Sequence, residues 1–171
     1  MKAFLKLPDH VYEELAAHLF ESKSEFEQAA FLFATESRDD QKIILEAIQL
    51  EKLGTDDFVA QEDCYLEMTD PTLGRIIKRA HDLRTCLVEV HSHVGDWPAA
   101  FSRSDVMGLK ETVPHIWWRL DNRPYLALVF ARTGFDALLF LETPNQPRRL
   151  DAILAGKQKL MPTNLSAESW K

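Results

Sequence analysis

Residues 89–111 of this chain, EVHSHVGDWPAAFSRSDVMGLKE, contain the pattern that decides the fold and the chemistry we expect. The first part ends an apolar run that begins near residue 85 and favours a strand. On a strand, His91 and His93 point to the same face, because alternate side chains share a face. The second part, Ser102-x-x-Asp105, is typical of a helix start, with a serine cap and an acidic residue in the first turn. A strand, a short loop and a helix would therefore bring two imidazoles near one carboxylate.

Two imidazoles and a carboxylate form a ligand set that binds zinc and leaves a fourth position open for water. Zinc held in this way lowers the pKa of its water to about 7, which makes a nucleophile at neutral pH. We therefore predict that His91, His93 and Asp105 bind one Zn2+ per chain. Each half of the pattern alone has a simpler interpretation, because His-x-His is common and Ser102 with Asp105 also forms an ordinary helix cap.

Outward from this stretch, the chain alternates helical and strand patterns. Capping residues and apolar periodicity predict helices over residues 8–20, 69–83, 102–110 and 147–156. Apolar or alternating runs predict strands over residues 26–35, 42–50, 85–91, 116–120, 125–131 and 135–142. Mixed helices and strands with late hairpins indicate an α+β fold, or an α/β-type mixed sheet.

The length of 171 residues favours a single domain, which we place over residues 1–156 with a C-terminal tail over residues 157–171. Lys and Arg total 20 against 27 Asp and Glu, so the formal net charge is −7. An acidic chain is a poor candidate for a nucleic-acid partner, because neutralising phosphates dominates that affinity.

Compartment and membrane association follow from the apolar runs and the cysteines. No apolar run reaches the ~20 residues of a membrane span, and the first residues do not form a signal peptide. The two cysteines, Cys64 and Cys86, are few enough to indicate a reducing compartment. We expect a cytoplasmic protein with no membrane partner, and no motif pairs either thiol with a base.

The combined pattern His-Ser-His-x8-Ser-x-x-Asp resembles the JAMM signature of the JAB/MPN metalloprotease family. The resemblance implies a cytidine-deaminase-like curved β-sheet flanked by helices. It also implies that His91, His93 and Asp105 bind zinc and that Ser102 helps to hold the tetrahedral intermediate. Ser92 would have a structural role at most. The spacer of eight residues before Ser102 departs from the usual seven, a difference that one loop residue absorbs.

The family's general acid/base is a glutamate that precedes an apolar strand after the first helix. Glu27 stands at that place, and Glu25, two residues earlier, is the alternative. Many bacterial members carry Cys-Gly after this glutamate, where this chain has Ala29-Ala30. That departure weakens the match around Glu27 more than the match of the zinc ligands.

The resemblance implies a JAMM zinc isopeptidase of deubiquitinase type, a metalloprotease that hydrolyses the bond after the C-terminus of a ubiquitin-like protein. The substrate would be a ubiquitin-like protein or its conjugate, in deconjugation or in precursor processing. Similar bacterial stand-alone proteins work beside activating and conjugating enzymes encoded in the same operon, including operons of antiviral defence. Such enzymes are therefore expected partners.

Three other interpretations remain open at this stage. The same residues would serve a JAMM peptidase that trims a sulfur-carrier protein. An MPN domain without metal would act as a scaffold or binding domain. An unrelated binding domain could carry both halves of the pattern by accident. Metal content separates the second and third interpretations from the first.

Overall fold

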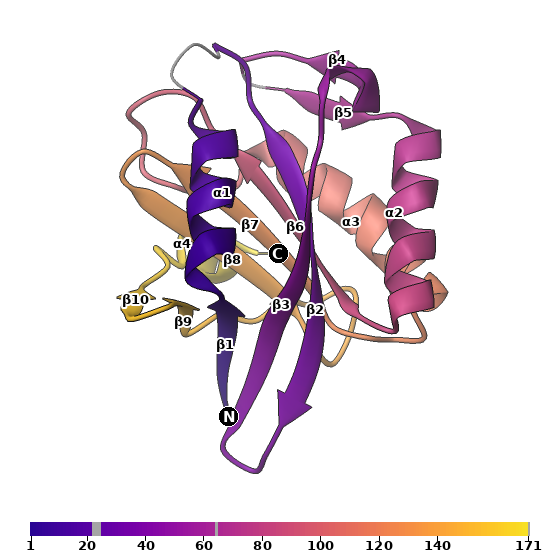
Figure 1. Cartoon of the computed structure of the whole chain (residues 1–171), viewed down its shortest axis with the longest axis vertical. Helices are drawn as coiled ribbons and strands as arrows, with labels where there is room; N and C mark the ends of the chain where they lie inside the picture. Colours follow the sequence, from indigo (N-terminus) through magenta and orange to yellow (C-terminus); the bar gives the residue numbers. More distant parts are fainter. Residues whose placement is uncertain (22–24, 64, 171) are drawn as a thin grey trace.

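Eight strands form one mixed sheet at the centre of the computed structural model, which describes residues 1–21, 25–63 and 65–170 (Figure 1). The strands are β1 (Lys2–Leu7), β2 (Ala29–Arg38), β3 (Lys42–Lys52), β6 (Cys86–Ser92), β7 (Tyr125–Ala131), β8 (Gly134–Phe140), β9 (Ala152–Ala155) and β10 (Gln158–Leu160). Their order across the sheet is β10-β9-β1-β3-β2-β6-β7-β8. β4 (Phe58–Gln61) and β5 (Leu66–Met68) pair as a small second sheet, after the short 3-10 helix η1 (Thr55–Asp57).

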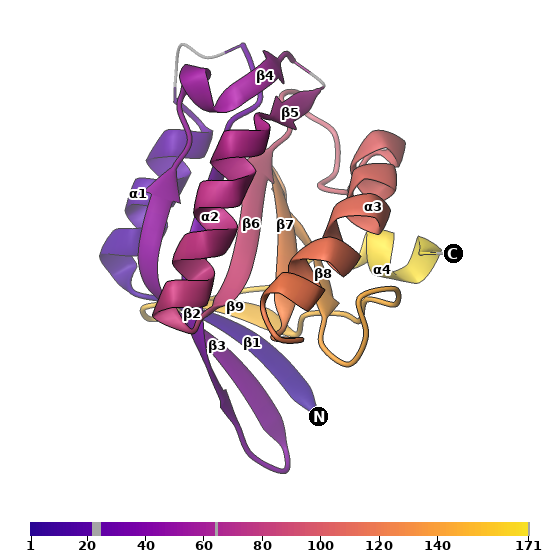
Figure 2. The ribbon, with the colours of Figure 1, turned by 90° about the vertical axis from the view of Figure 1, so that its right-hand side faces the viewer.

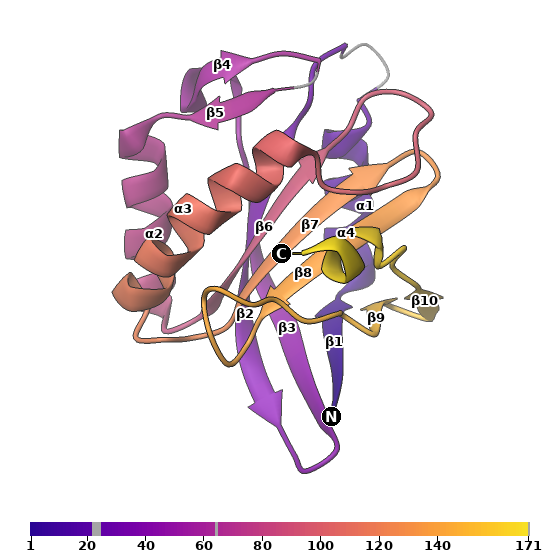
Figure 3. The same ribbon diagram turned by 180° about the vertical axis from the view of Figure 1, so that it is seen from behind.

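Helices cover both faces of the large sheet (Figures 2 and 3). α1 (Asp9–Leu19) packs on one face through three buried residues, Val11, Leu15 and Leu19. α2 (Asp70–Leu83), α3 (Arg103–Arg119) and α4 (Leu165–Ser169) lie on the other face. The strands alternate their apolar side chains between two core clusters, as a sheet covered on both faces requires. The predicted α+β fold with a mixed sheet is confirmed.

β6 lies inside the sheet and carries the first histidine of the His-Ser-His-x8-Ser-x-x-Asp pattern. It pairs antiparallel with β2 and parallel with β7. Six of its seven residues are buried, which explains why its sequence, CLVEVHS, is almost continuously apolar up to His91. The end of β6 therefore offers a rigid support for residues 91–93.

α2 begins as its sequence predicts. Thr69 caps it by accepting a hydrogen bond from the Thr72 N–H, and Pro71 occupies the first turn. The helix ends at Leu83, the predicted residue, and Arg84 follows with a left-handed φ of 55°.

Two predicted elements are wrong. Residues 116–120 are not a strand, because α3 continues to Arg119. The apolar run is short enough to fit either period, and Ile116, Trp117 and Leu120 are buried at helical spacing. Residues 147–156 are not a helix, because Ala152–Ala155 form β9 and pair with β1. β1 itself lies ahead of the first predicted element and was not predicted.

The segment expected as a C-terminal tail packs against the sheet as far as it is described. It contributes β10 and α4, and Trp170 is buried against Phe140, with ring centroids 5.6 Å apart. The Trp170 indole N–H donates to the Asn145 carbonyl at 3.1 Å. Lys171 lies outside the described residues.

Cys86 is buried, and burial raises the pKa of its thiol to about 12. A thiol of this kind is protonated at neutral pH and is a poor nucleophile. Cys64 lies outside the described residues. Within the described part of the chain, none of the helices has the length and apolar character needed to cross a membrane.

Replacing Trp170 with alanine should lower the free energy of unfolding by about 3 kcal/mol, because the change removes a buried indole and its hydrogen bond. The matched control is Trp118→Ala, since Trp118 is 73% exposed and should change stability by no more than about 0.5 kcal/mol. Urea denaturation followed by far-ultraviolet circular dichroism measures both. Equal effects of the two substitutions would show that residue 170 does not belong to the core.

Candidate metal centre

The end of β6 and the residue after Ser92 bring two histidines to one face of the sheet. His91 lies within β6, and the His93 N–H continues the ladder by donating to the Phe130 carbonyl at 2.8 Å. Ser92 between them points to the opposite face, where its buried hydroxyl accepts a hydrogen bond from the Gln28 N–H at 3.0 Å. The alternation of a strand therefore places both imidazoles together and gives Ser92 a structural contact.

The first turn of α3 brings the third side chain. Ser102 caps the helix: its hydroxyl accepts from the Asp105 N–H at 3.1 Å, and its own N–H donates to Asp105 Oδ2 at 2.7 Å. This reciprocal capping box holds the Asp105 carboxylate at the helix N-terminus. The eight-residue loop before Ser102 turns at Gly95, whose φ of 115° favours glycine.

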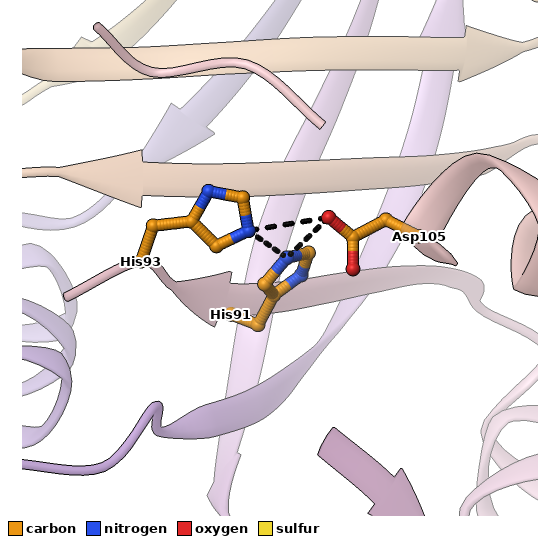
Figure 4. Close-up of side chains that lie close together, drawn as sticks. All are labelled: His91, His93 and Asp105. Atoms are coloured by element: carbon orange, nitrogen blue, oxygen red, sulfur yellow. Dashed lines mark hydrogen bonds and ion pairs between the residues drawn. The ribbon is translucent and has the colours of Figure 1, made fainter. Parts of the chain in front are cut away.

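The three side chains converge on one point (Figure 4). Nε2 of His91 and Nε2 of His93 lie 3.3 Å apart. Asp105 Oδ2 lies 3.2 Å from the His93 nitrogen and 3.6 Å from the His91 nitrogen. Tetrahedral zinc with ligand distances of about 2.0–2.1 Å separates its ligand atoms by about 3.3–3.4 Å. The donor types and their spacing therefore fit one metal ion of this kind.

The charges of the metal-free site favour a cation. Burial alone would raise the pKa of Asp105, but hydrogen bonds with the two imidazoles and with Ser102 hold that pKa well below its usual range. Burial alone would lower the pKa of His91, but the hydrogen bond and charge of Asp105 raise it overall. An ionised carboxylate beside two imidazoles is a site that a proton or a metal ion can occupy.

Glu27 lies at the rim of the three-residue group, two residues before β2 begins. Its Oε1 is 3.7 Å from His93 Nε2, and its side chain is almost fully buried. Burial raises the pKa of this carboxyl to about 7, although the two imidazoles act in the opposite direction. Its backbone is held by β4 and the residue after it: the Glu27 N–H donates to the Glu62 carbonyl, and Gln61 Nε2 donates to the Glu27 carbonyl.

Glu25, the alternative base, does not share this position. It is exposed, and it lines a different hollow together with His18 and Gln61. The structure therefore brings Glu27 to the two histidines and leaves Glu25 away from them. The Ser102 hydroxyl also reaches Ser104, at 2.9 Å, a neighbour that the sequence pattern does not include.

One half-buried acidic residue near the site was not predicted from the sequence. Glu89, two residues before His91 on the same face of β6, accepts a hydrogen bond from the Tyr125 hydroxyl. Burial raises the pKa of Glu89. Burial and the charge of Glu89 both raise the pKa of Tyr125. A charged residue inside an otherwise apolar strand was the available signal.

The comparison with protein families finds a match over most of the chain. The family model described as prokaryotic homologs of the JAB domain matches residues 8–134, which is more than half of the chain. No curated protein matches the chain significantly.

Two solved structures resemble the chain as a whole. A solution structure of a protein from Desulfitobacterium hafniense has a TM-score of 0.55 at 17% identity, covering 88% of this chain and 91% of its own. A solution structure of a protein from Salinibacter ruber has a TM-score of 0.47 at 14% identity, with coverage of 92% and 95%. The first of these likenesses supports the fold.

Removing either kind of ligand should abolish metal binding. His91→Ala and Asp105→Ala are each expected to weaken zinc binding by more than about 100-fold, because changes outside the ligand shell already cost about 10–100-fold. His115→Ala, which changes an exposed histidine of α3, should bind zinc like the unchanged protein. Competition with a chromophoric chelator measures all three. Unaltered zinc affinity in Asp105→Ala would disprove the ligand assignment.

Zinc affinity should fall as the pH falls. In the metal-free protein Asp105 raises the pKa of His91, so this imidazole keeps its proton to a higher pH than a free one, and zinc must displace that proton. Affinity is therefore expected to drop by at least about tenfold per pH unit below the His91 pKa, because each imidazole ligand must lose its proton before zinc binds. Asp105 stays ionised over this pH range, so it adds nothing to the dependence of zinc affinity on pH. Chelator competition between pH 5.5 and 8.5 measures the trend, and a flat profile contradicts it.

Proposed function

The chain belongs to the family of prokaryotic homologs of the JAB domain, and from this premise we propose that it is a zinc-dependent peptidase or isopeptidase acting after the C-terminus of a ubiquitin-like protein. The observation that carries the proposal is the convergence of His91, His93 and Asp105, with ligand atoms 3.2–3.6 Å apart. The carboxyl of Glu27, whose pKa is raised to about 7 by burial, lies beside them. Metal ligands and an acid/base group together are what hydrolysis of an amide requires.

His91, His93 and Asp105 would hold the ion. When bound, zinc supplies Lewis-acid polarisation of the substrate carbonyl and lowers the pKa of water. Glu27 accepts a proton from the water that attacks the carbonyl carbon. It then gives this proton to the amine nitrogen as the carbon–nitrogen bond breaks, so that acid and amine are the products. Burial favours the protonated form of this carboxyl, and the charge of a bound ion would favour the ionised form, so Glu27 can take up a proton and return it.

Ser102 has a second role in this proposal. Its hydroxyl oxygen accepts the Asp105 N–H, so the hydroxyl proton is available to donate, either to Ser104 or to the substrate. Turned to the substrate, it stabilises the negative charge that develops on the carbonyl oxygen. Hydrogen-bond donors placed at a developing oxyanion contribute about 100- to 1,000-fold to the rate of acyl transfer.

Exposed apolar side chains close in sequence to the site residues favour a protein substrate. Val94 and Trp97, on the loop between β6 and α3, are 38% and 77% exposed. Phe26, next to Glu27, is 52% exposed. Exposed apolar side chains near a site are typical of surfaces that contact another protein. In this proposal they contact the extended C-terminal tail of the substrate. Activating and conjugating enzymes of a ubiquitin-like system remain the proposed partners, in a cytoplasmic setting.

The function is tested with zinc-loaded protein and C-terminal aminocoumarin amides of ubiquitin and bacterial ubiquitin-like proteins. Cleavage that a chelator abolishes and zinc restores is the expected result. Release of the fluorophore from a sulfur-carrier protein alone would assign the activity to carrier trimming. Protein that binds no zinc and cleaves none of the panel would instead be a scaffold.

Glu27→Gln should bind zinc normally and lose at least about 100-fold in kcat/KM, because a general base contributes about 100- to 10,000-fold. Glu25→Gln is the matched control and should retain full activity, since Glu25 lies away from the histidines. Zinc affinity and cleavage are measured on the same preparations. The assignment of the base is wrong if the two substitutions exchange their effects.

A further inference from the structure

Two hydroxyl groups near the C-terminus bind the loop that precedes α3. The Ser166 hydroxyl of α4 accepts a hydrogen bond from the Phe101 N–H at 2.9 Å, and this bond is buried. The Thr163 hydroxyl donates to the Ala99 carbonyl at 2.7 Å. We call Thr163 and Ser166 the C-terminal clamp. The clamp joins residues more than sixty positions apart in the chain, so it is a tertiary contact and not part of a local turn.

The clamp is itself fixed to the sheet. The Ser166 N–H donates to Asp136 Oδ2 at 2.9 Å, and Asp136 is a fully buried residue of β8. The Thr163 N–H donates to the Phe135 carbonyl at 2.9 Å. Figure 3 shows α4 over β8, on the side of the sheet where α3 lies. The clamp therefore holds the loop in a fixed position relative to β8.

The loop is connected to the metal centre through the peptide unit that joins Phe101 to Ser102. Phe101 precedes Ser102, whose N–H donates to Asp105 Oδ2, the same oxygen that faces both imidazoles. The Phe101 ring also stands edge-on to His91, with centroids 5.7 Å apart. A shift of the Phe101 backbone would therefore move the ligand oxygen of Asp105 and loosen the packing of His91.

We infer that the C-terminal clamp positions the metal ligands, with Ser166 and Thr163 as positioning residues for Asp105. The inference rests on the proposed function in so far as that function requires a metal at this site. Without the Ser166 hydroxyl, the Phe101 N–H has no acceptor in a buried place, and the loop must move to find one. Direct hydrogen-bond partners of metal ligands typically change metal affinity by about 10- to 100-fold when removed, so the clamp, which acts through Ser102, is expected to reach the lower end of that range.

The test uses Co2+ as a spectroscopic probe of the site in the full chain. Ser166→Ala and Thr163→Ala are compared with Ser169→Ala, a matched control in which an exposed hydroxyl bonded only to carbonyls of α4 is removed. Each protein is titrated with Co2+, well below its melting temperature. Affinity and the visible absorption of the bound ion are recorded, because the absorption reports coordination geometry, which a mere loss of stability would not change.

Ser166→Ala should bind Co2+ about tenfold more weakly and show an altered visible spectrum, while Ser169→Ala matches the unchanged protein. Unaltered affinity and spectrum in Ser166→Ala would overturn the inference while leaving the metal site intact. If Ser166→Ala does not fold, Thr163→Ala decides by the same criterion, since Thr163 lies on the surface. Failure of the unchanged protein to bind Co2+ or Zn2+ would overturn the proposed function, and the inference with it.

Discussion

The site depends on one oxygen atom with three neighbours. Asp105 Oδ2 accepts the Ser102 N–H and stands within 3.6 Å of both imidazole nitrogens. The helix N-terminus stabilises the negative charge of this carboxylate, and the same charge attracts a cation to the histidines. The capping box and the candidate ligand set are therefore one arrangement, in which the beginning of a helix and the end of a strand are bound to each other.

The surrounding structure gives this arrangement its rigidity. β6 is buried on both faces, so the direction of His91 is set by the packing of the whole sheet. Glu27 comes from the segment before β2, where β4 and the following residue hold its backbone. Three separate segments of the chain thus meet beside the end of β6. The geometry of the site therefore does not depend on any single loop.

The sequence predicted what is encoded locally. His91 and His93 share a face because of strand alternation, and Ser102 and Asp105 cap a helix because they are three residues apart. The missed features join distant residues: β1 with β9, Glu89 with Tyr125, and Phe101 with Ser166. No spacing rule signals such pairs. The two mistaken elements, residues 116–120 and 147–156, were short segments whose state depends on tertiary contacts rather than on their own pattern.

The pairing of β1 with β9 has a consequence for the order of folding. β1 lies between β3 and β9 and runs parallel to both, although about 150 residues separate β1 from β9. Contacts of such long range form slowly, because a long loop must close before they are gained. During synthesis β1 therefore has an unpaired edge until residues 152–155 have left the ribosome. Over that interval the nascent chain exposes a strand edge on which another chain could pair.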